Sequence, residues 1–223
     1  MSSLKIKYDD DLVSGITKQG KTPVLFADSE KIIAAASIAD TVKDSSRQAV
    51  KELHKLGIKV IMITGDNRNT AEYISGIVGI DQTYSEVLPG DKAIKIRELQ
   101  KKGLNVAMAG DGINDAPALV QADVGIAMGT GTDVAIESAD ITLLAGDIMK
   151  IPQAIKLSKR TMRTIRQNLF WAFIYNIVGI PVAAGLFYPL WGIFLNPVFA
   201  GLAMAFSSVS VVINSLRLRF AKL

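Results

Sequence analysis

The stretch "LNVAMAGDGINDAPAL", residues 104–119, passes from an apolar run to a glycine-rich acidic loop and then to a helix-like pattern. The apolar run predicts a buried strand, and Asp111 follows its end. Gly110 and Gly112 permit a tight backbone path around this aspartate. Asp115 is expected in the first turn of the following helix. The stretch therefore predicts a strand, loop and helix with two carboxylates near the carboxyl end of the strand.

The same alternation of short apolar runs and helical patterns extends over residues 30–145. It is typical of a mostly parallel sheet with helices on both faces. In such sheets, ligands bind beyond the carboxyl ends of the strands. A second loop, "TGDN" at 64–67, follows the apolar run "IKVIMI" and is expected at the same edge. Asp44 and Asn69 are expected to be helix N-caps, and Gly57 and Gly103 are expected where helices stop.

The two loops combine residue types that bind Mg²⁺ and phosphate. Asp111 and Asp115 offer hard oxygen ligands, which suit Mg²⁺ when water and phosphate fill its other positions. Lys92, at the start of the intervening helix, is placed to neutralise a phosphoryl group. The alternative, in which the acidic loop only caps a helix, stays open. The candidate catalytic residues are Thr64, Gly65, Asp66, Lys92, Asp111, Asn114 and Asp115.

The last third of the chain has a different composition. The mean hydropathy of +0.30 is high for a wholly soluble protein, and 50 consecutive residues, 167–216, carry no formal charge. This length fits two membrane helices of roughly 20 residues and a turn, with spans near 168–188 and 197–216. Lys and Arg flank the run on both sides, so both ends are expected to face the cytoplasm.

The basic charge of the protein is concentrated beside this run. Residues 151–223 contain eight Lys and Arg and no Asp or Glu, whereas residues 1–150 are net acidic. The high pI is therefore no argument for nucleic acid, which we do not expect as a partner. The basic run "KLSKRTMRTIRQN", 156–168, is compatible with nucleic acid or anionic lipid, and its position beside a span favours a cytoplasmic stalk.

Several motifs in collinear order resemble the phosphorylation domain of P-type ATPases: "MITGDN", "LPGDKAIKI" and "GDGINDAPAL", followed by "ADVGIAMGTGTDVAIESAD". The resemblance implies an α/β, haloacid-dehalogenase-like Rossmannoid parallel sheet followed by a two-helix transmembrane hairpin. It also implies a domain order: 1–29, the tail of a nucleotide-binding domain ending in the strand "GKTPVLFA"; 30–150, the phosphorylation domain; 151–167, the basic stalk; and 168–223, the hairpin.

By resemblance, Asp111 and Asp115 hold Mg²⁺, Thr64 contacts the phosphoryl group and Lys92 stabilises its charge. The resemblance also implies ATP as a cofactor, bound near Asp40, Lys43, Thr64, Gly65 and Asp66. The segment "IADTVK", 38–43, stands where the family has Asp-Pro-x-Lys. Thr41 replaces the proline, which puts the rigidity of that loop in doubt.

Within the uncharged run, "YN" and "MAFSS" resemble the copper(I)-transporting subgroup of these ATPases. The implied ligands of Cu⁺ or Ag⁺ are Tyr175, Asn176, Met204 and Ser208. A thioether suits a soft monovalent ion better than Zn²⁺. The alternative role for polar residues here is hydrogen bonding between helices. An integral membrane protein, in the plasma membrane if bacterial, is expected.

The phosphorylated aspartate of the family lies in Asp-Lys-Thr-Gly-Thr, which is absent from these 223 residues. The chain is therefore expected to need a partner with the actuator domain, the first six spans and the nucleotide-binding domain, and not to complete the ATPase cycle alone. Two alternatives remain: a stand-alone phosphatase that uses Asp9, and a non-catalytic membrane protein that binds metal or a partner.

Overall fold

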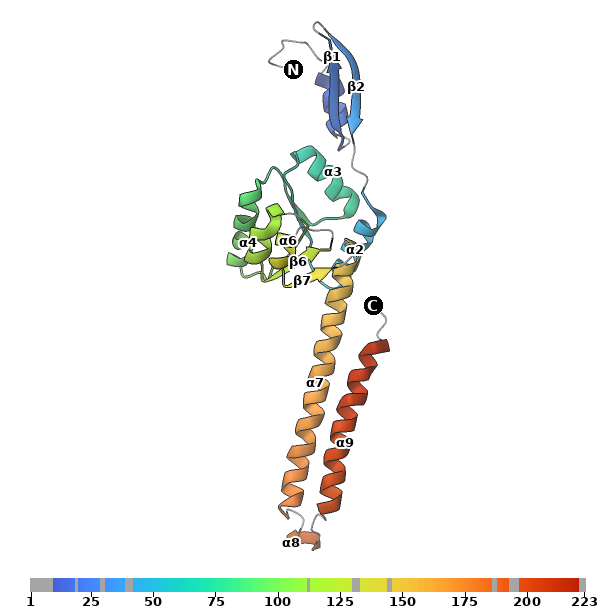
Figure 1. The fold of residues 1–223 in the computed structure, drawn as a ribbon, viewed down its shortest axis with the longest axis vertical. Helices are drawn as coiled ribbons and strands as arrows, with labels where there is room; N and C mark the ends of the chain where they lie inside the picture. The colour runs from blue at the N-terminus through green and yellow to red at the C-terminus, as the bar shows by residue number, and fades with distance from the viewer. Residues whose placement is uncertain are drawn as a thin grey trace. The chain divides into compact units, whose positions relative to one another are not determined.

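The computed structural model describes residues 10–18, 20–28, 31–38, 42–111, 113–129, 133–143, 146–185, 188–192 and 197–220. The chain divides into two compact units, Met1–Pro152 and Gln153–Leu223. The first unit contains all of the described strands, and the second contains two long helices (Figure 1).

The strands of the first unit are β1 (Thr22–Ala27), β2 (Ile32–Ile38), β3 (Ile61–Ile63), β4 (Gln82–Tyr84), β5 (Ala107–Gly110), β6 (Val124–Met128) and β7 (Ile141–Leu143). Its helices are α1 (Asp10–Lys18), α2 (Asp44–Lys55), α3 (Arg68–Val78), α4 (Lys92–Lys101), α5 (Ala116–Gln121) and α6 (Asp133–Glu137). Short 3₁₀ turns, η2 (Pro89–Asp91) and η3 (Ile113–Asp115), precede α4 and α5.

The pairing of β3 to β7 agrees with the predicted parallel α/β fold. β3 pairs in parallel with β4, and β6 lies between β5 and β7 in a second parallel sheet. A helix follows β3, β5 and β6 before the next strand, as parallel crossovers require.

β2 departs from the mostly parallel pairing predicted for residues 30–145. It pairs antiparallel with β1, with Leu25 opposite Ala35. The four residues between the two strands are too few for a parallel crossover, which needs about a dozen. The two strands therefore pair across the boundary predicted at residue 30.

The predicted helix stops are correct, but neither Asp44 nor Asn69 is the N-cap that it was expected to be. Gly57 and Gly103 follow α2 and α4 with φ of 76° and 79°, a left-handed conformation that glycine adopts without strain. Asn67, not Asn69, caps α3, and its side chain accepts a 3.0 Å hydrogen bond from the Thr70 N–H. Asp44 is the first residue of α2, and the N-cap position before it has no side-chain hydrogen bond. Asn69 already lies inside α3, where its position cannot cap the helix.

Three aspartates fasten the amino ends of the parallel strands. The Val60 N–H donates to Asp81 Oδ2 at 2.7 Å, and the Asp81 N–H donates back to the Val60 oxygen at 3.0 Å. The same reciprocal pair of bonds joins Asp123 to Val106 and Asp140 to Gly125. Each aspartate directly precedes a strand. Its pair of hydrogen bonds, called here the aspartate clamp, therefore sets where that strand begins beside its neighbour.

We expect Asp81→Asn to lower the melting temperature near neutral pH, and to have less effect in acid. The backbone N–H of Val60, and then the His54 ring at 2.8 Å, lower the pKa of Asp81. A carboxyl with a lowered folded-state pKa stabilises the fold above its unfolded pKa of about 3.9, and this stabilisation is lost as pH falls through the folded pKa. Melting temperatures of the variant and the parent should converge as pH falls through the lowered pKa of Asp81, below which both side chains are uncharged. A difference in melting temperature between variant and parent that does not change with pH would contradict a stabilisation that depends on the charge of Asp81.

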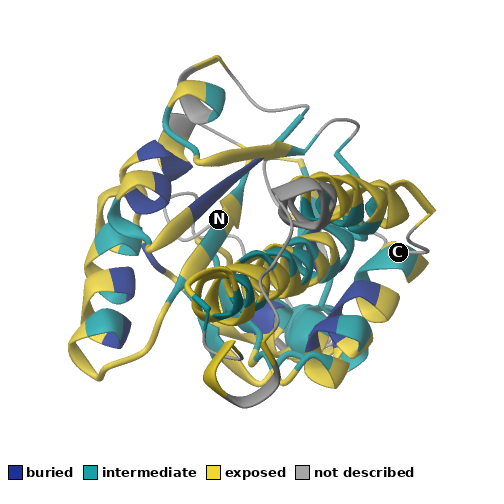
Figure 2. Cartoon of the chain, turned by 90° about the horizontal axis from the view of Figure 1, so that it is seen from below, coloured by how far each residue is buried: buried dark blue, intermediate teal, exposed yellow. Residues whose placement is uncertain are grey.

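The hydrophobic core lies in the first unit. Helices α2, α3, α4 and α5 contribute buried residues to it, and the middle residues of strand β6 are buried. Figure 2 shows these buried residues, with most of the remaining helical surface intermediate or exposed. The buried apolar residues that define this core include Ala49, Val50 and Leu53 of α2, Ile96 and Leu99 of α4, Ala118 and Leu119 of α5, and Ile126 and Ala127 of β6.

The second unit contains most of α7 (Lys150–Ala183), then α8 (Tyr188–Trp191), α9 (Pro197–Leu216) and a terminal 3₁₀ turn (Arg217–Phe220). α7 and α9 run side by side (Figure 1). Asn214 Nδ2 donates to Asn168 Oδ1 at 2.8 Å, and Asn168 Nδ2 donates to Ser215 Oγ at 2.9 Å. Across the described residues, no helix reaches the combined length and apolarity needed to cross a membrane.

Candidate functional site

A cavity of about 260 Å³ lies at the carboxyl ends of the parallel strands. β5 ends at Gly110, so Asp111 follows the strand directly, as predicted. Three charged residues line the cavity: Lys92, Asp111 and Asp115. Its apolar lining residues are Ile63, Met108, Ala109, Met128, Ile148 and Ile151.

Lys92 and Asp115 form an ion pair inside this cavity. Lys92 Nζ lies 2.7 Å from Asp115 Oδ1, and their side chains are 18% and 12% exposed. Asp115 is the one buried charged residue among the described part of the chain. Lys92 begins α4 and Asp115 directly precedes α5, so the pair connects two helix starts. Removal from water strengthens the attraction between the charges, and each makes burial of the other tolerable.

Gly110 is required for the close approach of Asp115 to β5. A Cβ atom on Gly110 would lie 2.7 Å from Asp115 Oδ2 and 2.9 Å from its Cγ. These distances are shorter than real Cβ contacts allow. Gly110 does not have positive φ, so its backbone conformation does not itself require glycine. It leaves room for the carboxylate, and Gly112 lies outside the described residues.

The "TGDN" loop is ordered by its own side chains. Thr64 Oγ1 donates to Asp66 Oδ2 at 2.8 Å and accepts from the Asp66 N–H at 3.1 Å. The Thr64 N–H donates to the oxygen of Tyr84, which aligns the loop with the end of β4. Thr64, Gly65 and Asp66 follow Ile63, a lining residue of the cavity, but are not themselves among its lining residues.

The other predicted residues that the structure describes do not line the cavity. Lys43 is exposed at the N-cap of α2, and Asn114 is exposed in η3. Asp40 and Asp9 lie outside the described residues, so the structure does not place them. Of the predicted set, the cavity therefore unites Lys92, Asp111 and Asp115.

The donor set fits Mg²⁺ better than a metal with a full protein coordination shell. Asp111 and Asp115 present hard carboxylate oxygens to one cavity, and Mg²⁺ is bound by one or two carboxylates with water and phosphate completing its octahedron. Within the described ranges, no group of three or more His, Cys, Asp or Glu is arranged to hold a metal. The cation of Lys92 adds a second point of attraction for an anionic ligand.

Residues 4–123 match the haloacid dehalogenase-like hydrolase family. The chain belongs to this family. The match agrees with the parallel strands and with the position of the acidic cavity beyond their carboxyl ends. It confirms the predicted haloacid-dehalogenase-like domain.

Curated relatives of this haloacid dehalogenase-like protein are P-type ATPases. It is 62% identical over 202 residues to the probable copper-transporting ATPase PacS of Synechocystis sp.. It is 55% identical over 222 residues to the copper-exporting P-type ATPase of Staphylococcus saprophyticus. These alignments cover 91% and 99% of this chain and 27% of each relative. The chain thus spans about a quarter of the length of these relatives.

A solved structure is also similar over most of the chain. The crystal structure of a zinc-transporting PIB-type ATPase in the E2.Pi state matches it with a TM-score of 0.79 and 35% sequence identity. The match covers 95% of this chain and 34% of that chain.

The predicted copper ligands lie on the two long helices of this haloacid dehalogenase-like protein. Tyr175 is 39% exposed, and its ring is 6.4 Å from the Trp171 ring. Asn176 Nδ2 donates to the Ala172 oxygen at 2.9 Å on its own helix. Ser208 is exposed on α9. The side chain of Met204 lies outside the described part of the structure, so the four-ligand site stays a prediction.

Two groups of residues had no distinct signal in the sequence. Met128, Ile148 and Ile151 close the apolar side of the cavity, but each belongs to an ordinary apolar pattern. Asn168 and Asn214 connect α7 to α9, and only their polarity inside an uncharged run distinguishes them. The hydrogen bond between them supports the helix-packing role for polar residues in that run.

Proposed function

We propose that this chain forms the Mg²⁺- and phosphate-handling part of an ATP-driven P-type pump that exports copper(I) or silver. The observation that carries the proposal is the cavity that joins Lys92, Asp111 and Asp115 at the carboxyl ends of parallel strands. Its carboxylates and ammonium match the needs of a phosphoryl-transfer site, where charge neutralisation and positioning supply most of the catalysis.

The roles of the cavity residues follow from their charges and burial. Asp111, exposed beside Asp115, would hold Mg²⁺ with it; bound Mg²⁺ would neutralise charge on the phosphoryl oxygens. Lys92 would attract the same oxygens and keep the Asp115 carboxylate oriented through their 2.7 Å contact. Asp66 orients the Thr64 hydroxyl, which with Gly65 would hydrogen-bond a phosphate approaching the strand ends. ATP and the aspartate that accepts its phosphate would come from the rest of the pump, together with the actuator and nucleotide-binding domains.

The second unit would be a two-helix membrane hairpin. The support is the run of 50 uncharged residues and the exposed apolar side chains on both helices, among them Phe173 at 62% on α7 and Phe206 at 66% on α9. Lipid would cover these side chains, because large exposed apolar surfaces otherwise attract other molecules. Both ends would face the cytoplasm, and in a bacterium the membrane would be the plasma membrane.

The transported ion would be Cu⁺ or Ag⁺, bound by Tyr175, Asn176, Met204 and Ser208. The uncharged run contains no Asp, Glu or Lys, so it offers only neutral ligands. Neutral ligands at membrane depth favour a monovalent ion over Zn²⁺, because a divalent ion there needs compensating charge. Thioether sulfur is also a ligand that selects Cu(I). The names of the 62% and 55% identical relatives point the same way.

We expect Mg²⁺ to bind the chain in the presence of a phosphate mimic such as tungstate. Asp111→Asn and Asp115→Asn should each weaken binding at least tenfold, because each removes one of the anionic oxygen donors. Isothermal titration calorimetry measures this affinity, and Asp91→Asn, an exposed aspartate before α4, is the matched control. Parent-like titrations of both cavity variants would place the metal elsewhere.

We expect copper(I), and not Zn²⁺, to stimulate ATP turnover once the chain is joined to the rest of the pump. Met204→Ala and Asn176→Ala should each reduce the stimulated turnover at least tenfold, since each removes a proposed ligand. Phosphate release by the complemented protein in proteoliposomes measures this effect. Tyr188→Phe, which changes a hydroxyl outside the proposed site, is the control. Stimulation by Zn²⁺ alone, or parent-like copper responses in both variants, would refute the ion assignment.

A further inference from the structure

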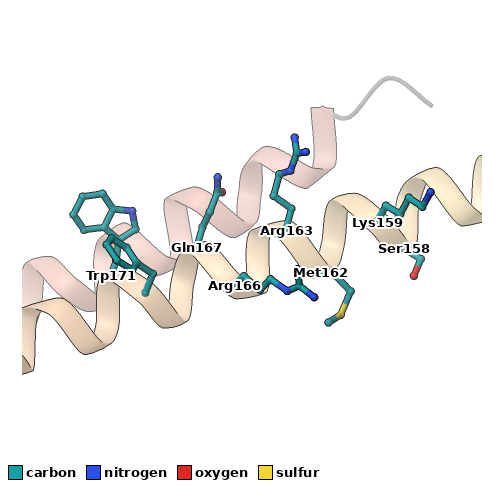
Figure 3. Close-up of a pocket in the computed structure, with 8 residues that line it drawn as sticks. Ser158, Lys159, Met162, Arg163, Arg166, Gln167 and Trp171 are labelled. Atoms are coloured by element: carbon teal, nitrogen blue, oxygen red, sulfur yellow. The ribbon is translucent and has the colours of Figure 1, made fainter. Parts of the chain in front are cut away.

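A surface groove of about 650 Å³ runs along α7 in the second unit. Its lining changes character along the helix. Lys159, Arg163 and Arg166 line one part, and Phe170 and Trp171 line the next (Figure 3 shows the cations and Trp171 in succession). The groove therefore joins a cationic surface to an aromatic one on a single helix.

The cations occupy one face of α7. Lys159, Arg163 and Arg166 follow each other at intervals of four and three residues, which places them one above another on a helix. All three are exposed. The stretch 151–223 contains no Asp or Glu, so no acidic side chain of this unit is available to neutralise them. Arg163 and Arg166 are therefore placed to attract an anionic ligand.

The aromatic end of the groove lies where the uncharged run begins. Phe170 and Trp171 are 58% and 50% exposed, and their rings contact edge to face at 5.5 Å. Tryptophan side chains gather at the level of lipid headgroups, and arginine beside them lies within reach of lipid phosphate. Along the groove, the cations precede residue 167 and the aromatic rings follow it. This order matches that of the headgroup and the acyl chains in a phospholipid.

We propose that this groove binds the phosphate headgroup of an anionic phospholipid in the cytoplasmic leaflet. The proposal rests on the membrane hairpin proposed above. Arg163 and Arg166 bind the phosphate, since guanidinium groups donate parallel hydrogen bonds to phosphate oxygens. Lys159 adds attraction from the next turn, while Phe170 and Trp171 contact the first carbons of the acyl chains. The groove would fix the depth and rotation of α7 in the bilayer.

Trp171 provides a local reporter for the test. The chain has two tryptophans, so Trp191→Phe leaves Trp171 as the sole indole. This variant is reconstituted in phosphatidylcholine vesicles that contain brominated phosphatidylglycerol or brominated phosphatidylcholine, and quenching of Trp171 measures which lipid occupies the groove. We expect phosphatidylglycerol to be preferred about tenfold, which is the scale of one or two lysine or arginine contacts with an anionic membrane.

Arg163→Gln/Arg166→Gln should remove most of this preference. Arg217→Gln/Arg219→Gln, which deletes the same charge at the end of α9, should retain it, and inorganic phosphate in excess should not displace the lipid. Equal quenching by both lipids in the parent, equal losses in both double variants, or displacement by inorganic phosphate would each overturn the lipid site. Absence of quenching by either lipid would instead show that α7 is not in the bilayer, which would refute the proposed hairpin itself.

Discussion

Replacement of Gly110 by alanine is expected to disable the cavity, with a loss of turnover of about 100-fold in the complemented pump, the scale of a misplacement of about 1 Å. The added Cβ would lie 2.7 Å from Asp115 Oδ2 and 2.8 Å from its Cβ, so the aspartate must move. Because Asp115 pairs with Lys92 at 2.7 Å, the same movement separates the ion pair. Overpacking of this kind also destabilises a fold by about 1–3 kcal/mol.

Gly76→Ala is the matched control for this substitution. Gly76 lies inside α3 with no atom within 4 Å of an added Cβ, so the same methyl group meets open space. Alanine there should leave turnover unchanged and stabilise the helix by about 0.5–1 kcal/mol. Turnover is measured as phosphate release, stability as the midpoint of urea unfolding, and Mg²⁺ affinity by titration. Parent-like turnover and Mg²⁺ affinity in Gly110→Ala would show that Asp115 does not need its observed position.

Lys92→Met is expected to destabilise the first unit by about 2–4 kcal/mol, because it leaves a buried carboxylate without its cation. Asp115 has a side chain only 12% exposed, so water compensates little for the lost ammonium. The double variant Lys92→Met/Asp115→Asn should recover part of this loss, since it removes the charge that had become unpaired. Urea unfolding of the two single variants and the double variant measures the coupling between the side chains.

Lys101→Met is the control for the loss of a lysine charge. Lys101 is exposed at the end of the same helix, so its replacement should change stability by no more than about 0.5 kcal/mol. Additive effects of Lys92→Met and Asp115→Asn would contradict an ion pair in solution. In the complemented pump, both single variants should also lose turnover, because each removes a group that faces the proposed phosphoryl site.

Local patterns in the sequence determined much of the fold and the position of Asp111 in the site. Apolar periodicity located the strand that ends at Gly110, and therefore placed Asp111 at the sheet edge. Gly57 and Gly103 marked helix ends because positive φ is a local preference of glycine. The uncharged run likewise predicted a helix over 197–216, and α9 has these bounds. Such features depend on neighbours within one or two turns, so the sequence contains their cause.

Tertiary structure decided the features that join distant residues. The Lys92–Asp115 pair spans 23 positions, and the reason for Gly110 appears only when Asp115 packs against it. The hydrogen bond between the Val60 N–H and Asp81 has no signal in the sequence, where Asp81 is typical of an ordinary turn. Asn67 and Asn69 are equally suited to capping by residue type. Asn67 is the cap because α3 begins directly after it, at Arg68. In each case the energy comes from an atom brought close by the packing of other elements, and no local pattern records that distance.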